Sequence, residues 1–316
     1  MEGNTTNMSV GKRKTRAATL SVASNSLLIL LKLVVGISIG SVSVVSEAIH
    51  SSIDLVAAII AFFSVRISDR PPDADHPYGH GKVENISGFV EALLILLAAM
   101  LIVYEAGQKI IFGGEIEFVG LGIAVMLVSS LVNILVSKYL SRVAAATDSI
   151  ALEADACHLQ TDVLTSAGVL VGLVVVQLTG WSIIDPIFAI GVAAVIAKVA
   201  FDLTKKSSPG LLDSKLPDAE EQEICGILNQ HLTHFISFHA LRSRKAGARR
   251  HIDLHLVVDD NVSVRQAHGL CDHLEEEIGN HFPNTEVTIH VEPASSHDPN
   301  AEAHGDDAES TSSRAS

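Results

Sequence analysis

Charged residues are scarce in this chain. They make up 18% of its 316 residues, whereas apolar residues make up 48%, and the mean hydropathy is +0.36. A soluble domain could not bury so much apolar surface, so the scarcity of charge predicts a membrane protein with a soluble appendage. Cysteine is also rare. Cys157, Cys225 and Cys271 are odd in number and form no CxxC pair, so the sequence indicates neither a disulfide framework nor a zinc ribbon, and we expect reduced, cytosol-facing thiols.

Acidic residues are in excess, but in only one part of the chain. The formal net charge is −14, and the chain from Pro209 onward holds 19 acidic and 8 basic residues, whereas the part before it is close to balance. The acidity therefore belongs to a soluble C-terminal part. Such a surface argues against a nucleic acid partner and favours the attraction of cations.

Six apolar stretches are long enough to cross a hydrocarbon core, which requires about 20 helical residues. A basic cluster, Lys12–Arg16, precedes the first stretch, but that stretch is too long for a signal peptide and five more follow it. We expect Lys32, late in the first stretch, to extend its ammonium group to the membrane interface. The predicted spans are Ala17–Gly40, Ser41–Ile67, Val83–Ile111, Phe118–Leu140, Ile150–Thr179 and Ile183–Leu203.

Lysine and arginine are concentrated on alternate connections between these spans. The N-terminus, the loops 66–82 and 138–148 and the segment after the sixth span are basic, whereas the intervening loops hold essentially Lys109 alone. Because basic loops stay in the cytoplasm, this pattern predicts that both termini are cytoplasmic.

The pattern changes after the sixth span to short amphipathic units. Helices are predicted over 218–231 and 263–281, and strands over 237–244, 250–258 and 286–292. The order αββαβ predicts a small α+β domain of the ferredoxin-like or metallochaperone-like kind. The expected organisation is a basic N-terminal segment (1–16), an all-α six-helix transmembrane domain (17–208), a cytoplasmic α+β domain (209–292) and a disordered acidic tail (293–316).

Two His/Asp pairs of the same spacing lie inside membrane-length segments. His50 precedes Asp54 by four residues in the second span, and His158 precedes Asp162 by four in the fifth, so each pair shares one helix face. Structural hydrogen bonds between helices are the alternative, but two unrelated pairs have no reason to share identity, order and spacing. An aspartate in a span costs about 2.5–3.5 kcal/mol to insert, which favours a functional role. Facing each other, the pairs offer the tetrahedral N2O2 site that zinc prefers.

Charge balance suggests what such a site does. A divalent cation held by two carboxylates and two neutral imidazoles is formally neutral, so the loaded site avoids most of the cost of burying charge. Releasing the cation leaves two carboxylates at membrane depth, and protons are the natural replacement. Exchange of metal for protons follows as a hypothesis.

Two further groups of residues could hold a cation. Asp73, His76 and His80 can converge if Pro77 and Gly79 bend their loop, with an ordinary solvated loop as the alternative. In the α+β domain the candidates are His239, His255, His268, His290 and Glu292, with surface histidines of no ligand role as the alternative. We expect six other histidines to face solvent or to collect metal weakly: His231, His234, His273, His281, His297 and His304.

The paired HxxxD helices, the loop Asp73–Lys82 with its D-x-D-H-P-Y-G-H-G-K sequence and the histidine-bearing αββαβ tail together resemble the cation diffusion facilitator family of divalent-metal exporters. The resemblance covers about Thr15 to Pro293 and includes the bacterial ferrous-iron/zinc efflux proteins. It implies a homodimeric, proton-coupled antiporter in the prokaryotic inner membrane and not an enzyme. It also implies a transport site (His50, Asp54, His158, Asp162), a loop site (Asp73, His76, His80), a binuclear dimer-bridging site (His239, His255, His268, His290, Glu292) and a salt bridge between Lys82 and Asp213.

The chain departs from the family pattern at two positions. His50 stands where the best-studied ferrous-iron/zinc members have aspartate, and an imidazole there favours zinc over manganese or magnesium, with cadmium, cobalt and nickel still possible. Glu292 stands where an aspartate is expected in the soluble site. The alternatives are an exporter of cadmium, cobalt, iron or manganese, a membrane zinc sensor, and an intramembrane metalloenzyme. The last requires an HExxH or similar motif, and no HExxH occurs in the sequence.

Overall fold

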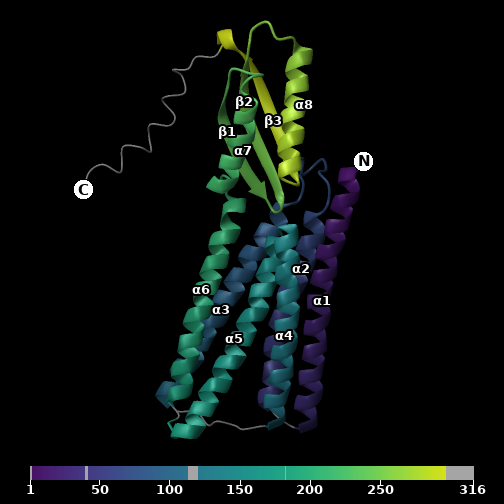
Figure 1. The fold of residues 1–316 in the computed structure, drawn as a ribbon. Coiled ribbons are helices and arrows are strands. Elements are labelled where there is room, and N and C mark those ends of the chain that lie inside the picture. Colours follow the sequence, from purple (N-terminus) through teal and green to yellow (C-terminus); the bar gives the residue numbers. More distant parts are fainter. Residues whose placement is uncertain (1, 40–41, 113–119, 182, 297–316) are drawn as a thin grey trace, which may run out of the picture. The chain divides into compact units, whose positions relative to one another are not determined.

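The computed structural model describes residues 2–39, 42–112, 120–181 and 183–296 (Figure 1). The chain divides into two compact units. Of the described residues, the first unit comprises those up to 213 with 246–248, and the second comprises 214–245 with 249–296.

The first unit is all-helical (Figure 1). Within the described residues, six helices are long and apolar enough to cross a membrane. This confirms the six-helix, all-α prediction for the first part of the chain. The helices are α1 (Glu2–Ile39), α2 (Val42–Ser68), α3 (Lys82–Phe112), α4 (Gly120–Thr147), α5 (Ile150–Thr179) and α6 (Ile184–Leu211).

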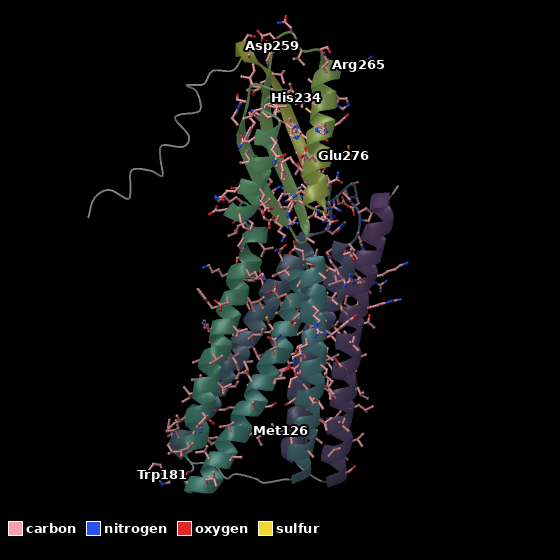
Figure 2. The ribbon with its side chains drawn as sticks, in the orientation of Figure 1. Met126, Trp181, His234, Asp259, Arg265 and Glu276 are labelled. Carbon is pink, nitrogen blue, oxygen red and sulfur yellow. The ribbon has the colours of Figure 1, made fainter. Side chains whose placement is uncertain are left out.

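Small residues lie between these helices and large apolar ones cover their outer faces. The most extensive packing joins α3 to α6, α1 to α2 and α4 to α5. Ala18 and Ala154 are fully buried, whereas Leu27 and Leu131 are exposed. Small residues at helix contacts and large apolar residues facing outward are the pattern that a lipid environment favours. Trp181, 69% exposed, lies at the turn between α5 and α6 (Figure 2), where an aromatic ring suits a membrane interface.

Helix α4 is longer than its predicted span, so the prediction of a loop over 138–148 is wrong. The helix continues to Thr147 because its last turns still bury an apolar face, with Leu140 and Ala144 packed among buried residues of α1 and α5. The connection to α5 is then very short. Asp148 takes a left-handed conformation (φ 53°) and the Ser149 side chain caps α5 by accepting from the Leu152 N–H.

Two other helix ends extend beyond the hydropathy signal. Helix α6 runs to Leu211 rather than Leu203, and Ser207 within this extension is fully buried. Gly88 makes that contact possible, since a Cβ there would lie 2.7 Å from the Ser207 hydroxyl. At the other end of the chain, α1 includes residues 2–16, which were expected to form a separate N-terminal segment.

The second unit has the predicted αββαβ order. Its sheet has the order β1-β2-β3, and β2 runs parallel to β3 with His255 opposite His290. This confirms the α+β prediction for the second part of the chain. The elements are α7 (Asp218–Gln230), β1 (Ser237–Ala246), β2 (Arg249–Val258), α8 (Val264–His281) and β3 (Thr285–Pro293).

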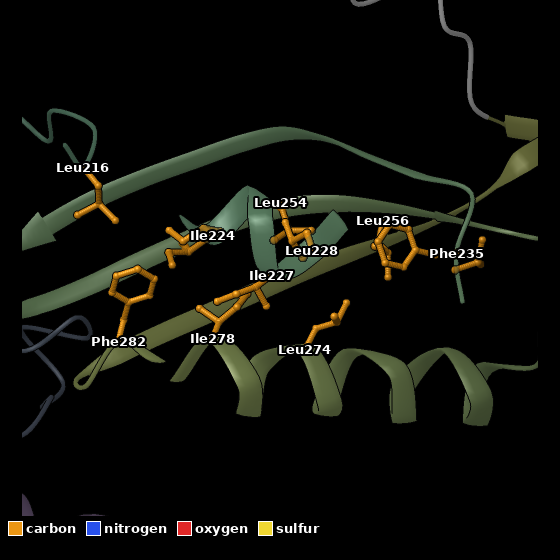
Figure 3. Close-up of a cluster of buried hydrophobic side chains, with 12 residues drawn as sticks. Leu216, Ile224, Ile227, Leu228, Phe235, Leu254, Leu256, Leu274, Ile278 and Phe282 are labelled. Atoms are coloured by element: carbon orange, nitrogen blue, oxygen red, sulfur yellow. The ribbon is translucent and has the colours of Figure 1, made fainter. Parts of the chain in front are cut away.

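Helices α7 and α8 cover the apolar face of this sheet (Figure 3). Leu274 and Ile278 of α8 and Ile224 of α7 join Leu254 and Leu256 of β2 in one buried cluster. Helix α8 begins with a reciprocal capping box between Ser263 and Gln266. Of the predicted tail, residues 294–296 form a short 3-10 helix and residues 297–316 lie outside the described residues.

Candidate functional site

Three members of the predicted intramembrane tetrad meet in the structure. Asp54 comes from α2, and His158 and Asp162 come from α5; their ligand atoms all lie within 4.8 Å of one another. The His158 Nε2 atom is 3.1 Å from Asp54 Oδ1. Asp54 and His158 are buried, at 8% and 5% exposure. The side chain of His50, the fourth member, lies outside the described residues.

The helices explain this convergence. His158 and Asp162 are four residues apart on α5, so both point from one face, and α2 packs against α5 at their level. Thr161 donates its hydroxyl to the backbone carbonyl of His158 at 2.7 Å and so satisfies its polar side chain locally. The arrangement therefore offers at least one imidazole and two carboxylates to a single cation in a buried place.

Two buried carboxylates close to this group were not assigned to it from the sequence. Glu91 on α3 is fully buried, and Asp155 and His158 are near enough to act on its charge. Asp155, one turn before His158, is 1% exposed. An acidic residue inside an apolar run is the sequence signal that marks Glu91.

The prediction that Lys32 extends to the membrane interface is wrong. Its side chain is buried, and its ammonium group donates to the Ser51 hydroxyl at 2.6 Å. The close packing of α1 against α2 places that acceptor within reach. The Lys32 ammonium group therefore finds a polar partner inside the helix bundle, whereas in a single isolated helix it would have to reach the membrane interface.

A buried charge cluster joins four helix ends. The Lys14 ammonium of α1 lies 2.9 Å from Glu84 Oε1 of α3, and the same carboxylate accepts from Ser68 at 2.8 Å and from Ser149 at 2.5 Å. Asp69 is 3.6 Å from Lys14. Burial raises the pKa of Asp69, and the negative charge of Glu84 acts in the same direction, while Lys14 opposes both. These contacts bind α1, α2, α3 and the start of α5 together.

The loop after α2 folds back as its sequence indicates. Asp73 Oδ1 lies 3.2 Å from His76 Nδ1, and Asp73 Oδ2 lies 3.3 Å from His80 Nε2. Gly79 allows the turn by adopting φ 82°. The backbone N–H of His76 donates to the Asp73 carboxylate and lowers its pKa, which keeps this potential ligand ionised.

The sheet of the second unit gathers most of the other predicted ligands. His239, His255 and Glu292 come from β1, β2 and β3, and their ligand atoms lie within 4.8 Å of one another. Glu292 Oε1 is 3.0 Å from His255 Nδ1 and 3.6 Å from His290 Nε2. His268 is not part of this group within one chain: its Nδ1 lies 3.6 Å from Asp272 on the same helix, and its side chain is 75% exposed.

The predicted salt bridge is formed within one chain. The Lys82 ammonium, at the start of α3, lies 2.9 Å from Asp213 Oδ2, directly after α6. Asp213 has a left-handed backbone (φ 53°), which ends the helix and turns the carboxylate toward Lys82. Because both side chains are partly exposed, the pair contributes little to stability and mainly fixes the two helix ends.

Residues 18–212 match the model of the cation efflux transmembrane domain, and residues 216–294 match that of the cytoplasmic domain of cation efflux proteins. The chain belongs to the cation efflux family. It is therefore a cation efflux transporter with transmembrane helices, and the resemblance drawn from its motifs is confirmed.

Two curated transporters resemble this chain over most of its length. The cation-efflux pump FieF of Salmonella paratyphi A is 32% identical over 289 residues, which cover 92% of this chain and 96% of that protein. The uncharacterized transporter sll1263 of Synechocystis sp. is 34% identical over 268 residues, covering 85% of this chain and 86% of that protein.

Two solved structures match a smaller part of this cation efflux protein. The zinc form of CzrB is 36% identical, covers 27% of this chain and 96% of that chain, and gives a TM-score of 0.26. A second CzrB structure is 39% identical, covers 25% of this chain and 96% of that chain, and gives a TM-score of 0.24.

Proposed function

We propose that this cation efflux protein exports Zn2+ from the cytoplasm in exchange for protons, with His50, Asp54, His158 and Asp162 as the transport site. The observation that carries the proposal is the meeting of Asp54 with His158 and Asp162, from two different helices, in a buried place. His50 lies on α2 one helical turn before Asp54, which is the spacing of the pair on α5.

The proposed ligand set favours zinc among divalent cations. Two imidazoles and two carboxylates suit tetrahedral coordination, with Zn–N and Zn–O distances of about 2.0–2.2 Å. Manganese and magnesium prefer oxygen ligands in octahedral sites. Cadmium, cobalt and iron accept mixed nitrogen and oxygen sites and are the alternative cargoes.

Proton coupling is supported by the contact between His158 and Asp54. At 3.1 Å, the imidazole Nε2 and the carboxylate Oδ1 are within hydrogen-bonding distance, and we infer that one proton lies between them. A divalent cation bound by both atoms displaces that proton, and release of the cation lets it return. Alternating access of this site to the two membrane faces then exchanges metal for protons. The buried Glu91 and Asp155 are the nearby groups that could hold further protons.

The remaining sites and the topology complete the proposal. We place the protein in the inner membrane, as a homodimer with both termini in the cytoplasm, since basic residues are concentrated at the N-terminus and on loop 66–82. The proposed domains remain 17–208 for transport and 209–292 for metal binding and dimerisation. The loop site (Asp73, His76, His80) and the sheet site (His239, His255, His290, Glu292) would bind zinc, with His268 contributed across the dimer.

The role of His50 can be tested by its effect on selectivity. In His50→Asp, an oxygen ligand replaces an imidazole, so we expect the ratio of manganese flux to zinc flux to rise by about tenfold. The measurement is flux of Zn2+, Mn2+ and Cd2+ into proteoliposomes at matched concentrations. An unchanged ratio in a variant that still transports zinc would remove His50 from the transport site.

The same assay tests the proposed cargo. The unaltered protein should carry zinc and cadmium faster than manganese, because the latter lacks affinity for imidazole-rich tetrahedral sites. Faster transport of manganese than of zinc would contradict the assignment of zinc. Zinc binding with no flux of any of the three metals would contradict transport and favour a sensor.

A further inference from the structure

The two helices of the second unit carry a group of metal-binding residues that is separate from the sheet site. His231 directly follows α7, and His273 and Glu277 are four residues apart on α8. Their ligand atoms all lie within 4.8 Å of one another. None of these three residues belongs to the sheet site or to the transport site. His231 and His273 were expected to face solvent or to collect metal weakly, and nothing in the sequence indicated that the packing of α7 against α8 brings them together.

Both imidazoles point at the same carboxylate oxygen. Glu277 Oε2 lies 2.5 Å from His231 Nε2 and 3.8 Å from His273 Nε2. The two rings are 5.0 Å apart between centres and nearly perpendicular. Ligand atoms about 2.0–2.1 Å from a tetrahedral zinc ion are separated from one another by about 3.3 Å, and the two distances lie on either side of that value. Small side-chain movements would bring all three atoms onto one cation.

A hydrogen-bonded ion pair does not account for the group. Helices α7 and α8 are also joined by Glu223 and His281, which lie 2.9 Å apart and form a simple two-membered pair. His273, one helical turn before Glu277, would be a second donor, but its Nε2 lies 3.8 Å from the carboxylate, which is too long for a hydrogen bond. The presence of a third potential ligand atom distinguishes this group from the Glu223–His281 pair.

We propose that His231, His273 and Glu277 form a cation site that binds one zinc-type divalent ion and fastens the end of α7 to α8. Two imidazoles and one carboxylate provide three of four tetrahedral positions. Water can take the fourth position, because the His273 side chain is 57% exposed. His234, whose ring centre is 6.3 Å from that of His231, is the alternative fourth ligand (Figure 2).

The site has a structural or regulatory role rather than a place on the transport path. It lies outside the six membrane-length helices, and it joins His231, directly after α7, to two residues of α8. A ligand that binds only the folded state stabilises it in proportion to the logarithm of its concentration. Zinc bound here would therefore stabilise the second unit as the free zinc concentration rises.

Glu277→Gln in the full-length protein tests the proposal, with Glu223→Gln as the matched control. Glutamine keeps the shape and a hydrogen bond to the histidine, but it is a poor zinc ligand. We expect Glu277→Gln to lose about one zinc ion per chain in equilibrium dialysis of the detergent-purified protein followed by elemental analysis. Glu223→Gln, which alters the equivalent two-membered pair, should bind as much zinc as the parent.

His273→Ala further distinguishes a shared metal site from a hydrogen-bonded ion pair. Because His273 is too far from Glu277 to hydrogen-bond, its loss should leave the metal-free unfolding temperature near the parent value. It should also remove the same zinc ion and reduce the zinc-induced rise in unfolding temperature. If Glu277→Gln and His273→Ala both bind as much zinc as the parent, the proposed site is contradicted. Because this test measures binding, its outcome is independent of whether the protein transports zinc.

Discussion

Zinc flux should fall to background when Asp162 is replaced by alanine. The variant removes one of two carboxylates from the proposed site and leaves an incomplete ligand set with an uncompensated positive charge when zinc binds. Loss of a residue that only orients a ligand already costs about 10–100-fold in metal affinity, so loss of the ligand itself should cost at least about 100-fold. Asp54→Ala should behave in the same way, because its carboxylate is the partner of His158.

The measurement is initial zinc uptake by proteoliposomes that contain equal amounts of folded protein. Asp202→Ala is the matched control. Asp202 is exposed and lies on α6, so this substitution removes a carboxylate that is not part of the proposed site. We expect parent-like flux in this control. Full flux in Asp54→Ala or Asp162→Ala would show that the tetrad is not the transport site.

The second large effect is expected from Lys14→Met. Lys14 and Glu84 form an ion pair whose side chains are only 5% and 1% exposed, so the variant leaves the Glu84 carboxylate buried with only the hydroxyls of Ser68 and Ser149. Removing one partner of such a pair costs about 3–5 kcal/mol. We therefore expect a marked fall in the unfolding temperature of the detergent-purified protein.

Two further variants make this prediction specific. Arg16→Met removes an exposed cation two residues away and should leave the unfolding temperature almost unchanged. Adding Glu84→Gln to Lys14→Met neutralises the orphaned carboxylate and should restore most of the loss, which a double-mutant cycle measures. Equal unfolding temperatures for Lys14→Met and Arg16→Met would contradict the importance of the buried pair.

Helix α5 shows how far the sequence can fix a boundary. Its predicted range, 150–179, matches the structure, because Ser149 caps one end and Gly180, with φ 73°, ends the other. The ends of α4 and α6 were placed too early. Hydropathy reports where a bilayer ends, whereas backbone hydrogen bonding continues for as long as a helix face stays packed.

The candidate sites also combine features that the sequence predicts with contacts that depend on packing. The spacing of His158 and Asp162 predicts a shared helix face, but only the packing of α2 against α5 brings Asp54 to them. The position of the Lys32 ammonium group was predicted wrongly because its acceptor, Ser51, lies on another helix. His273 and Glu277 share a face of α8 by their spacing, but the addition of His231 follows no periodicity, since it depends on how two helices cover the sheet. Local chemistry could be predicted from the sequence, whereas the contacts between distant segments that were predicted, such as Lys82 with Asp213, came from the resemblance to a family.

The most direct test of the central claim is zinc uptake by proteoliposomes under an imposed pH gradient. With an acidic lumen, outward movement of protons should drive zinc inward through molecules inserted with their cytoplasmic side outward, and a protonophore should abolish the increase. We expect this proton-driven component in the parent and not in Asp162→Ala. Zinc uptake by the parent that is the same with and without the pH gradient would contradict zinc/proton exchange.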